Sequence, residues 1–321
     1  MPATSLRRTA IVQLILATAA WGLSFPLLKM LFAIQGRHAP EAGTVFLSAH
    51  AIGVRSLLAV LVLLAFNRSA LRGLKRAEWT QGALLGFFGG CGLMLQADGL
   101  NYTPASVSAF LTQFYCVLLP AWVCLYLKKW PSLLMICCTL MVVAGMVILS
   151  GFDWRTLHLG RGEWETLASA VFFTVQIQLL DRPAWRGNRM VPVSILMFVG
   201  FVVVTLPVLV WKAPSISTVF ALYQNWPELI MMAIVTLFCT VYAYTAMNKW
   251  QPYVSAVEGG LIYCLEPVYT TIYTLFLPAW LAAACGVPYA NEVLTTAAVT
   301  GGLLITGANI LLQMSNTAQE K

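Results

Sequence analysis

The residues of this 321-residue chain that are best suited to chemistry are charged residues inside long apolar stretches. They are Lys29, Arg55, Asp98, Glu258 and Glu266. A charge at the centre of a membrane-spanning helix costs roughly 2.5–3.5 kcal/mol on insertion scales, so each side chain needs a partner or water. Arg55 and Glu266 lie near the middle of stretches about 20 residues long, too deep to reach a membrane surface. These two residues are therefore candidates for a substrate or proton site.

The other three charges lie nearer the ends of their stretches. Lys29 is about five residues from an end, or ~7.5 Å at ~1.5 Å per residue, so its amine can extend to the interface. Asp98 lies close to an end and could face a water-filled vestibule. Glu258 shares one helix face with Ile262 and Glu266 at four-residue steps. We include Glu258 with the deep charges as a candidate for proton coupling or for a buried structural charge.

The composition indicates a membrane protein. Hydrophobic residues make up 60% of the chain and charged residues 10%, against about 45–50% and 25% in soluble domains. This balance excludes a soluble enzyme, a disordered chain and a secreted disulfide scaffold. The unbroken apolar runs also differ from the alternating strands of an outer-membrane barrel. We expect an all-α polytopic protein in a lipid bilayer, with no nucleic-acid partner, because the net charge of +7 is typical of basic cytoplasmic loops.

Ten apolar stretches are long enough to cross a bilayer. Their approximate limits are 11–34, 45–66, 80–100, 104–127, 133–151, 163–180, 191–211, 228–248, 253–277 and 291–313. Of the 19 Lys and Arg residues, thirteen fall on the same side as the N-terminus and four on the other. This asymmetry places both termini in the cytoplasm of a protein of the cell (inner or plasma) membrane. We interpret the basic loop 68–76 as an orientation signal rather than a lipid-binding site.

The two halves of the chain resemble each other. Ala19-Ala20-Trp21 aligns with Ala170-Val171-Phe172, and Thr103-Pro104-Ala105 aligns with Ser255-Ala256-Val257, at nearly the same offset. These matches predict two repeats of five helices, residues 1–158 and residues 159–321. Because five is odd, the second repeat would enter the membrane from the opposite side, and such inverted-topology repeats are typical of secondary transporters.

Signatures of enzymes and metal sites do not occur in the sequence. It contains neither a G-x-x-x-x-G-K-[ST] phosphate loop nor an H-E-x-x-H metalloprotease motif. The eight cysteines show no metal-ligand spacing. We therefore expect no enzymatic activity, no metal and no cofactor.

Several motifs resemble the EamA-type ten-helix members of the drug/metabolite transporter superfamily, over about residues 11–313. They are Trp21-Gly22-x-x-Phe25-Pro26-x-x-Lys29, Val54-Arg55-x-Leu57-Leu58, Leu265-Glu266-Pro267-Val268 and Gly301-Gly302-Leu303-Leu304-Ile305-x-Gly307. The long apolar loop 278–290 departs from the family pattern and could hold a short interfacial helix. The resemblance implies a secondary transporter whose first, third, fourth, sixth, eighth and ninth spans line a central cavity.

Polar and aromatic residues on those spans become candidates for binding a small-molecule substrate. They are Trp21, Gln96, Gln113, Tyr115, Gln176, Tyr244 and Tyr263. We expect small organic solutes, amino-acid-like or organic-cation-like, because aromatic faces suit organic cations. Outward, proton-coupled transport is our main hypothesis. An importer or facilitator, and a non-transporting receptor or assembly component, are the alternatives. The oligomeric state is left open by the sequence, and a monomer is compatible with it.

The two deep charges also have a structural interpretation. They could form a buried ion pair, or they could bond to a backbone carbonyl that Pro267 leaves free, because proline has no N–H. Both residues match general features of the family that the chain resembles. For that reason we favour the structural interpretation for Arg55 and keep both interpretations open for Glu266.

Overall fold

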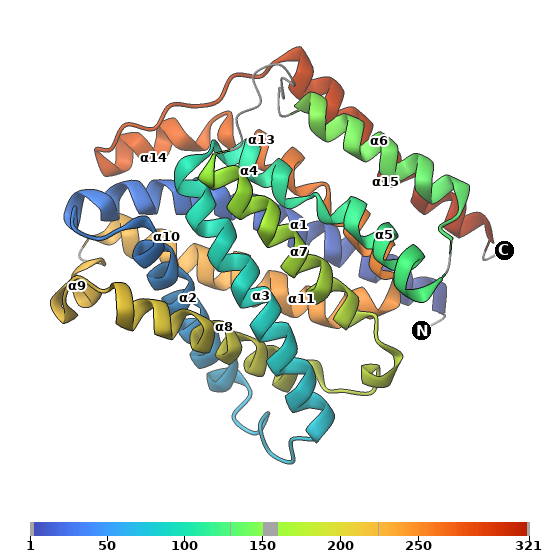
Figure 1. Cartoon of the computed structure of the whole chain (residues 1–321), viewed down its shortest axis with the longest axis horizontal. Helices are drawn as coiled ribbons and strands as arrows, with labels where there is room; N and C mark the ends of the chain where they lie inside the picture. The colour runs from blue at the N-terminus through green and yellow to red at the C-terminus, as the bar shows by residue number, and fades with distance from the viewer. Residues whose placement is uncertain (1–2, 129, 150–159, 224, 320–321) are drawn as a thin grey trace.

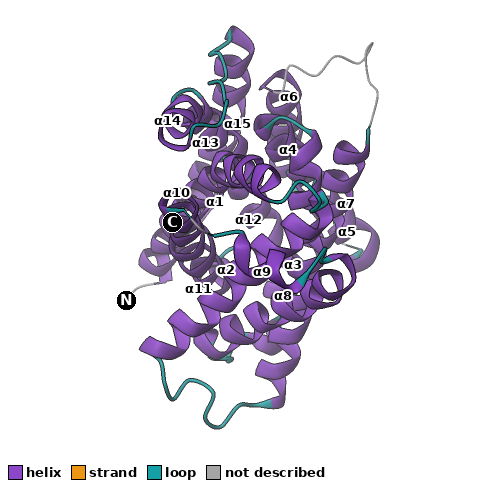
Figure 2. Ribbon diagram, turned by 90° about the vertical axis from the view of Figure 1, so that its left-hand side faces the viewer, coloured by secondary structure: helices purple, strands orange, loops and turns teal. Residues whose placement is uncertain are grey.

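The computed structural model describes residues 3–128, 130–149, 160–223 and 225–319 (Figure 1). Every regular element among these residues is a helix, as Figure 2 shows. The α-helices are α1 (Ala3–His38), α2 (Thr44–Phe66), α3 (Arg76–Tyr102), α4 (Ala105–Thr112), α5 (Tyr115–Leu127), α6 (Leu133–Leu149), α7 (Arg161–Leu180), α8 (Met190–Lys212), α9 (Ile216–Ala221), α10 (Trp226–Ile234), α11 (Ala243–Trp250), α12 (Ala256–Tyr263), α13 (Glu266–Thr274), α14 (Leu277–Cys285) and α15 (Thr296–Gln319). The all-α class predicted from composition is confirmed.

Helix occupies most of each of the ten predicted stretches, but not all of these helices are long spans. Six described helical segments are long and apolar enough to cross a membrane, or seven if α12, α13 and α14 form one bent span. The apolar parts of α6 and α15, Leu133–Ile148 and Thr296–Leu312, are shorter, and α7 carries three charged residues in its first five positions. The count of ten spans therefore stays a prediction. The boundary predicted between residues 158 and 159 lies outside the described residues.

Two of the predicted spans are interrupted near their middle. The helices α4 and α5 are separated by Gln113 and Phe114, and α12 and α13 by Cys264 and Leu265. Each interruption is a tighter helical turn, since the N–H of Gln113 bonds three residues back to the carbonyl of Phe110 at 3.1 Å. The interruptions are about 151 residues apart, which is the offset between the sequence motifs.

A third irregularity lies between α10 and α11. Residues Val235–Tyr242 form a π-helix, and the Thr240 hydroxyl donates to the carbonyl of Val235 five residues earlier at 2.9 Å. Wider helical turns of this kind are frequent at functional sites. The sequence analysis did not predict this segment.

Glycines allow two pairs of helices to pack closely. A Cβ atom on Gly86 of α3 would lie 2.7 Å from the Cα atom of Gly200 on α8. A Cβ atom on Gly145 of α6 would lie 2.7 Å from the carbonyl oxygen of Gly301 on α15. The helices α6 and α15 lie side by side at one edge of the bundle (Figure 1). Such contacts between small residues are a main route of helix association in membranes.

The unusual apolar loop contains a helix, as expected. The helix α14 is bent by 54° from the preceding α12–α13 segment, and Gly286 ends it in the left-handed conformation at φ +66°. Glycine is favoured at this position because it has no Cβ atom.

Candidate functional site

A central cavity lies among seven of the predicted spans and has a volume of about 50 Å³. It is lined by Trp21, Ser24, Arg55, Leu93, Gln96, Thr112, Tyr115, Phe173, Gln176, Ile177, Cys239, Tyr244, Met247, Tyr263 and Glu266. Ligand pockets for drug-sized molecules usually measure about 300–1,000 Å³. The cavity in this conformation therefore has room for a few water molecules.

Two opposite charges line this cavity without forming an ion pair. Arg55 on α2 is 3% exposed, and Glu266 at the start of α13 is 6% exposed. In the described part of the chain, no ion pair joins them within 4.0 Å, and the buried Nε atom of Arg55 has no hydrogen-bond partner. The buried pair offered as a structural interpretation is not formed. A buried guanidinium without an anion is costly, so this side chain is poised to receive one.

Glu266 is held by the opposite helix interruption. Its Oε2 atom accepts a hydrogen bond of 2.5 Å from Nε2 of Gln113, which lies in the turn between α4 and α5. As the first residue of α13, Glu266 also lies at the positive end of a helix dipole, which favours a carboxylate. The two helix interruptions thus meet beside the cavity. Gln113 does not line the cavity itself, although the sequence analysis placed it among the substrate-binding residues.

Aromatic rings form one wall of the cavity. The centroid of the Trp21 ring lies 5.2 Å from that of Tyr244 and 5.3 Å from that of Tyr263. These separations are typical of favourable tilted and edge-to-face packing. The buried indole N–H of Trp21 has no hydrogen-bond partner in the described structure, so it is available to a ligand or water.

The amide side chains on the cavity wall are partly engaged with the protein. Nε2 of Gln96 donates to the hydroxyl of Thr112 at 3.0 Å, linking α3 to α4. Nε2 of Gln176 makes a long contact of 3.5 Å with the carbonyl of Leu85. Weak or single bonds of this kind leave part of each amide free to bind a solute.

A close crossing of α1 and α13 places Trp21 and Glu266 at the same level in the helix bundle. A Cβ atom on Gly22 would lie 2.9 Å from the Cβ atom of Tyr269 and 3.1 Å from the carbonyl oxygen of Glu266. Only glycine lets α1 approach α13 this closely. Because Trp21 precedes Gly22, the crossing places the indole at the level of the carboxyl group.

The remaining deep charges lie outside the cavity. Glu258, predicted with the coupling group, forms an ion pair with Arg7 and connects α12 to the start of α1. Asp98 forms an ion pair with Arg161, so α3 is tied to α7 rather than open to a vestibule. These pairs join helices far apart in sequence.

Lys29 also bonds to the protein. Its amine donates to the backbone carbonyls of Leu100 and Thr103 at the end of α3. The end of a helix leaves such carbonyl groups free, and Lys29 is only partly buried, so the reach of its amine toward the interface stays a prediction.

Some lining residues were missed by the sequence analysis. Phe173 and Ile177 lie on the same face of α7 as Gln176, so helical spacing around that amide could have indicated them. Cys239 lies in the π-helix, and nothing in its sequence context distinguishes it from the other apolar cysteines.

Comparisons with known proteins agree with this architecture. Residues 8–151 match the model of the EamA-like transporter family. An uncharacterized transporter from Archaeoglobus fulgidus is 24% identical over 309 residues, which cover 96% of this chain and 87% of the relative. A crystal structure of another protein has the same fold, with a TM-score of 0.63 at 16% identity, covering 98% of this chain and 100% of that one. The EamA-like match over residues 8–151, the transporter relative and the several helices that could cross a membrane together support a membrane protein related to the drug/metabolite transporter superfamily.

Proposed function

We propose that this protein is a secondary transporter of small organic solutes and that the central cavity is its substrate site. The observation that carries the proposal is that Arg55 and Glu266 share one cavity with a wall of aromatic rings. These two buried opposite charges form no ion pair with each other in the described structure. A protein that only assembles with others has no need of such a site, because buried charges are expensive in a membrane.

The cavity favours an amino-acid-like substrate over a simple organic cation. A zwitterion can present its carboxylate to Arg55 and its ammonium group to Glu266, and the rings of Trp21, Tyr244 and Tyr263 can cover the ammonium group or an apolar side chain. An organic cation would use Glu266 and the rings but would leave the guanidinium without an anion. Gln96, Tyr115 and Gln176 complete the predicted binding set in the proposal, while Gln113 acts through Glu266.

Binding requires the helices around the cavity to separate. A volume of about 50 Å³ is too small for such a solute, so the described conformation is a contracted one. The turns at Gln113 and Cys264 and the π-helix Val235–Tyr242 interrupt regular hydrogen bonding beside the cavity. We propose that these three segments are the hinges of alternating access.

In this proposal the protein has ten spans in two inverted repeats, residues 1–158 and 159–321, with both termini in the cytoplasm of the cell membrane. The matching positions of the two helix interruptions support the repeat. The excess of Lys and Arg on the N-terminal side supports the orientation.

We assign outward transport and proton coupling to the same site. Glu266 can carry a proton because its carboxyl group is buried beside the substrate, where protonation would release the Gln113 amide and the bound ammonium group. Glu258 is not given this role, since Arg7 already neutralises it away from the cavity.

Flux in proteoliposomes tests the proposal. The purified chain is reconstituted and tested with radiolabelled amino acids, nucleosides and organic cations, with and without an imposed pH gradient. We expect gradient-dependent flux of amino acids. Flux that is independent of the gradient would indicate a facilitator. No flux of any solute would overturn transport and favour a receptor or assembly role.

A further inference from the structure

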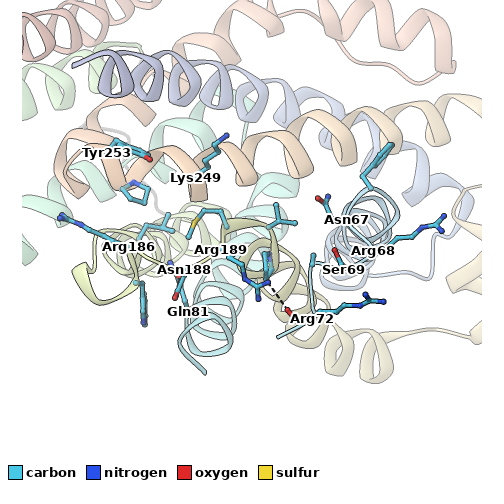
Figure 3. A pocket seen from close by; sticks show the side chains of 18 of the residues that line it. Asn67, Arg68, Ser69, Arg72, Gln81, Arg186, Asn188, Arg189, Lys249 and Tyr253 are labelled. Atoms are coloured by element: carbon cyan, nitrogen blue, oxygen red, sulfur yellow. Dashed lines mark hydrogen bonds between the residues drawn. The ribbon is translucent and has the colours of Figure 1, made fainter. Parts of the chain in front are cut away.

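A second and much larger pocket lies away from the central cavity, at the end of the bundle that holds the loop between α2 and α3. Its volume is about 1130 Å³, and it is bounded by this loop, the α7–α8 connection and the α11–α12 connection (Figure 3). Five of its lining residues are basic: Arg68, Arg72, Arg186, Arg189 and Lys249. No acidic residue lines it among the described residues.

One of the five cations is already neutralised. Arg189 donates from Nε and from a terminal nitrogen to the two carboxylate oxygens of buried Glu78, each at 2.8 Å. It also donates to the carbonyls of Arg72 and Gly73 at 3.2 Å, so it fastens the α2–α3 loop to the start of α8. Arg189 therefore builds the pocket floor rather than attracting a ligand.

The other four cations have no carboxylate within 4.0 Å in the described structure. Asp181 is the acidic group that acts on Arg186 from farther away, and it accepts a backbone hydrogen bond from Ala256. Arg186 lies on one side of the pocket and Arg68 and Arg72 on the other, with exposed ends that extend outward (Figure 3). Rotation of these long side chains can bring them over a bound anion.

An apolar groove continues from this basic pocket. The groove has a volume of about 290 Å³ and shares Met190, Val191 and Lys249 with the pocket. Its other lining residues include Leu63, Tyr242, Ala246 and Trp250. Gln13, Ser194 and Thr245 complete its lining.

One strongly exposed apolar side chain lies at the basic pocket. Phe66, which lines the pocket, is 84% exposed. In a membrane protein such a side chain faces lipid. A cationic pocket that opens into a lipid-facing apolar groove is therefore complementary to a phospholipid. The pocket suits the anionic headgroup, and the groove suits an acyl chain.

We propose that the basic pocket and the groove together bind one anionic phospholipid. Its phosphate lies among Arg68, Arg72 and Arg186, Lys249 reaches it from the junction, and an acyl chain follows the groove along Tyr242 and Ala246. Arg68 and Arg72 of the loop 68–76 then bind lipid in addition to orienting the chain, which revises our interpretation of the sequence. The membrane leaflet follows from the proposed orientation and is the cytoplasmic one, whose anionic lipids attract basic segments.

Lipid binding to the purified full chain tests this inference without any transport assay. Dioleoyl phosphatidylglycerol is titrated into the protein in a neutral detergent, with dioleoyl phosphatidylcholine as the reference, and bound lipid is counted by native mass spectrometry. We expect one phosphatidylglycerol to be retained tightly. Equal retention of the two lipids would overturn the proposal.

Matched variants locate the site. Arg68→Gln/Arg72→Gln should weaken phosphatidylglycerol binding about 25-fold, equivalent to about 2 kcal/mol at 1.4 kcal/mol per tenfold, since each cation contributes roughly 1 kcal/mol. The control Arg8→Gln/Arg76→Gln removes the same charge from exposed arginines that do not line the pocket and should leave the affinity unchanged. If both double variants weaken binding equally, the effect comes from the overall surface charge, and the location of the site at Arg68 and Arg72 is contradicted.

Two further ligands separate a lipid from a soluble anion. Dihexanoyl phosphatidylglycerol has the same headgroup with short chains, and we expect it to bind at least tenfold more weakly than the dioleoyl form because it leaves the groove partly empty. Inorganic phosphate should compete only weakly. If inorganic phosphate competes as strongly as the dioleoyl lipid does, the pocket binds a soluble anion and the lipid assignment is overturned.

Discussion

The crossing of α1 and α13 at Gly22 predicts a sharp stability difference between two glycines of one helix. In Gly22→Ala the new methyl group would lie 2.9 Å from the Cβ atom of Tyr269 and 3.1 Å from both the Glu266 carbonyl oxygen and the Thr270 nitrogen. None of these atoms is the end of a flexible side chain, so the helices must separate. Overpacking of this kind costs about 1–3 kcal/mol.

Gly36, on the same helix, provides the matched control. A Cβ atom there would meet nothing within 4 Å, so Gly36→Ala should stabilise the protein by up to about 1 kcal/mol through helix propensity. Thermal unfolding of both variants in detergent, followed by tryptophan fluorescence, measures the difference. We expect the midpoint of Gly22→Ala below that of the parent chain and the midpoint of Gly36→Ala at or above it. Equal midpoints for the two variants would refute the close crossing and the placement of Trp21 beside Glu266.

Three other predictions concern coupling, stability and topology. Glu266→Gln should retain the fold at a loss of about 1 kcal/mol, the difference between a charged and a neutral hydrogen bond, and should lose pH-driven flux; normal gradient-driven flux in a stable variant would contradict the coupling role. Arg189→Ala should lower the thermal midpoint because it removes the partner of the buried Glu78 carboxylate, whereas Arg186→Ala should not. Similar midpoints for both variants would contradict the structural role of Arg189. A membrane-impermeable maleimide should label Ser69→Cys only from the cytoplasm and Ala290→Cys only from outside, with the parent chain as the control for native cysteines. The reverse pattern would overturn the orientation.

Much of the helical architecture was predictable because ten apolar stretches dominate the sequence. Bilayer thickness fixes the length of a spanning helix, and the apolar runs around Arg55 and Glu266 satisfy it. The interruption at Gln113 was not predicted, since no proline or glycine occurs at that turn. The π-helix was missed for the same reason.

The side-chain partners were harder to predict. These helices are apolar on most faces, so hydrophobic periodicity does not say which side is turned inward. Arg55 and Glu266 could be placed at similar depth, but only the structure shows that they line one cavity without touching. The pair of Arg7 and Glu258 joins residues 251 apart in sequence, and no local pattern predicts such a contact.

Competition among three solutes of similar shape tests the substrate site most directly. Phenylalanine, phenethylamine and 3-phenylpropionate share an aromatic side chain but carry both charges, only the cation or only the anion. Proteoliposomes with the parent chain, with Arg55→Gln and with Glu266→Gln are compared, after thermal unfolding shows that each variant is folded. The account predicts that the parent chain prefers the amino acid, that Arg55→Gln loses the preference for the amino acid over the amine, and that Glu266→Gln loses the preference over the acid. Unchanged preferences in both folded variants would contradict the central claim that these two charges bind the substrate.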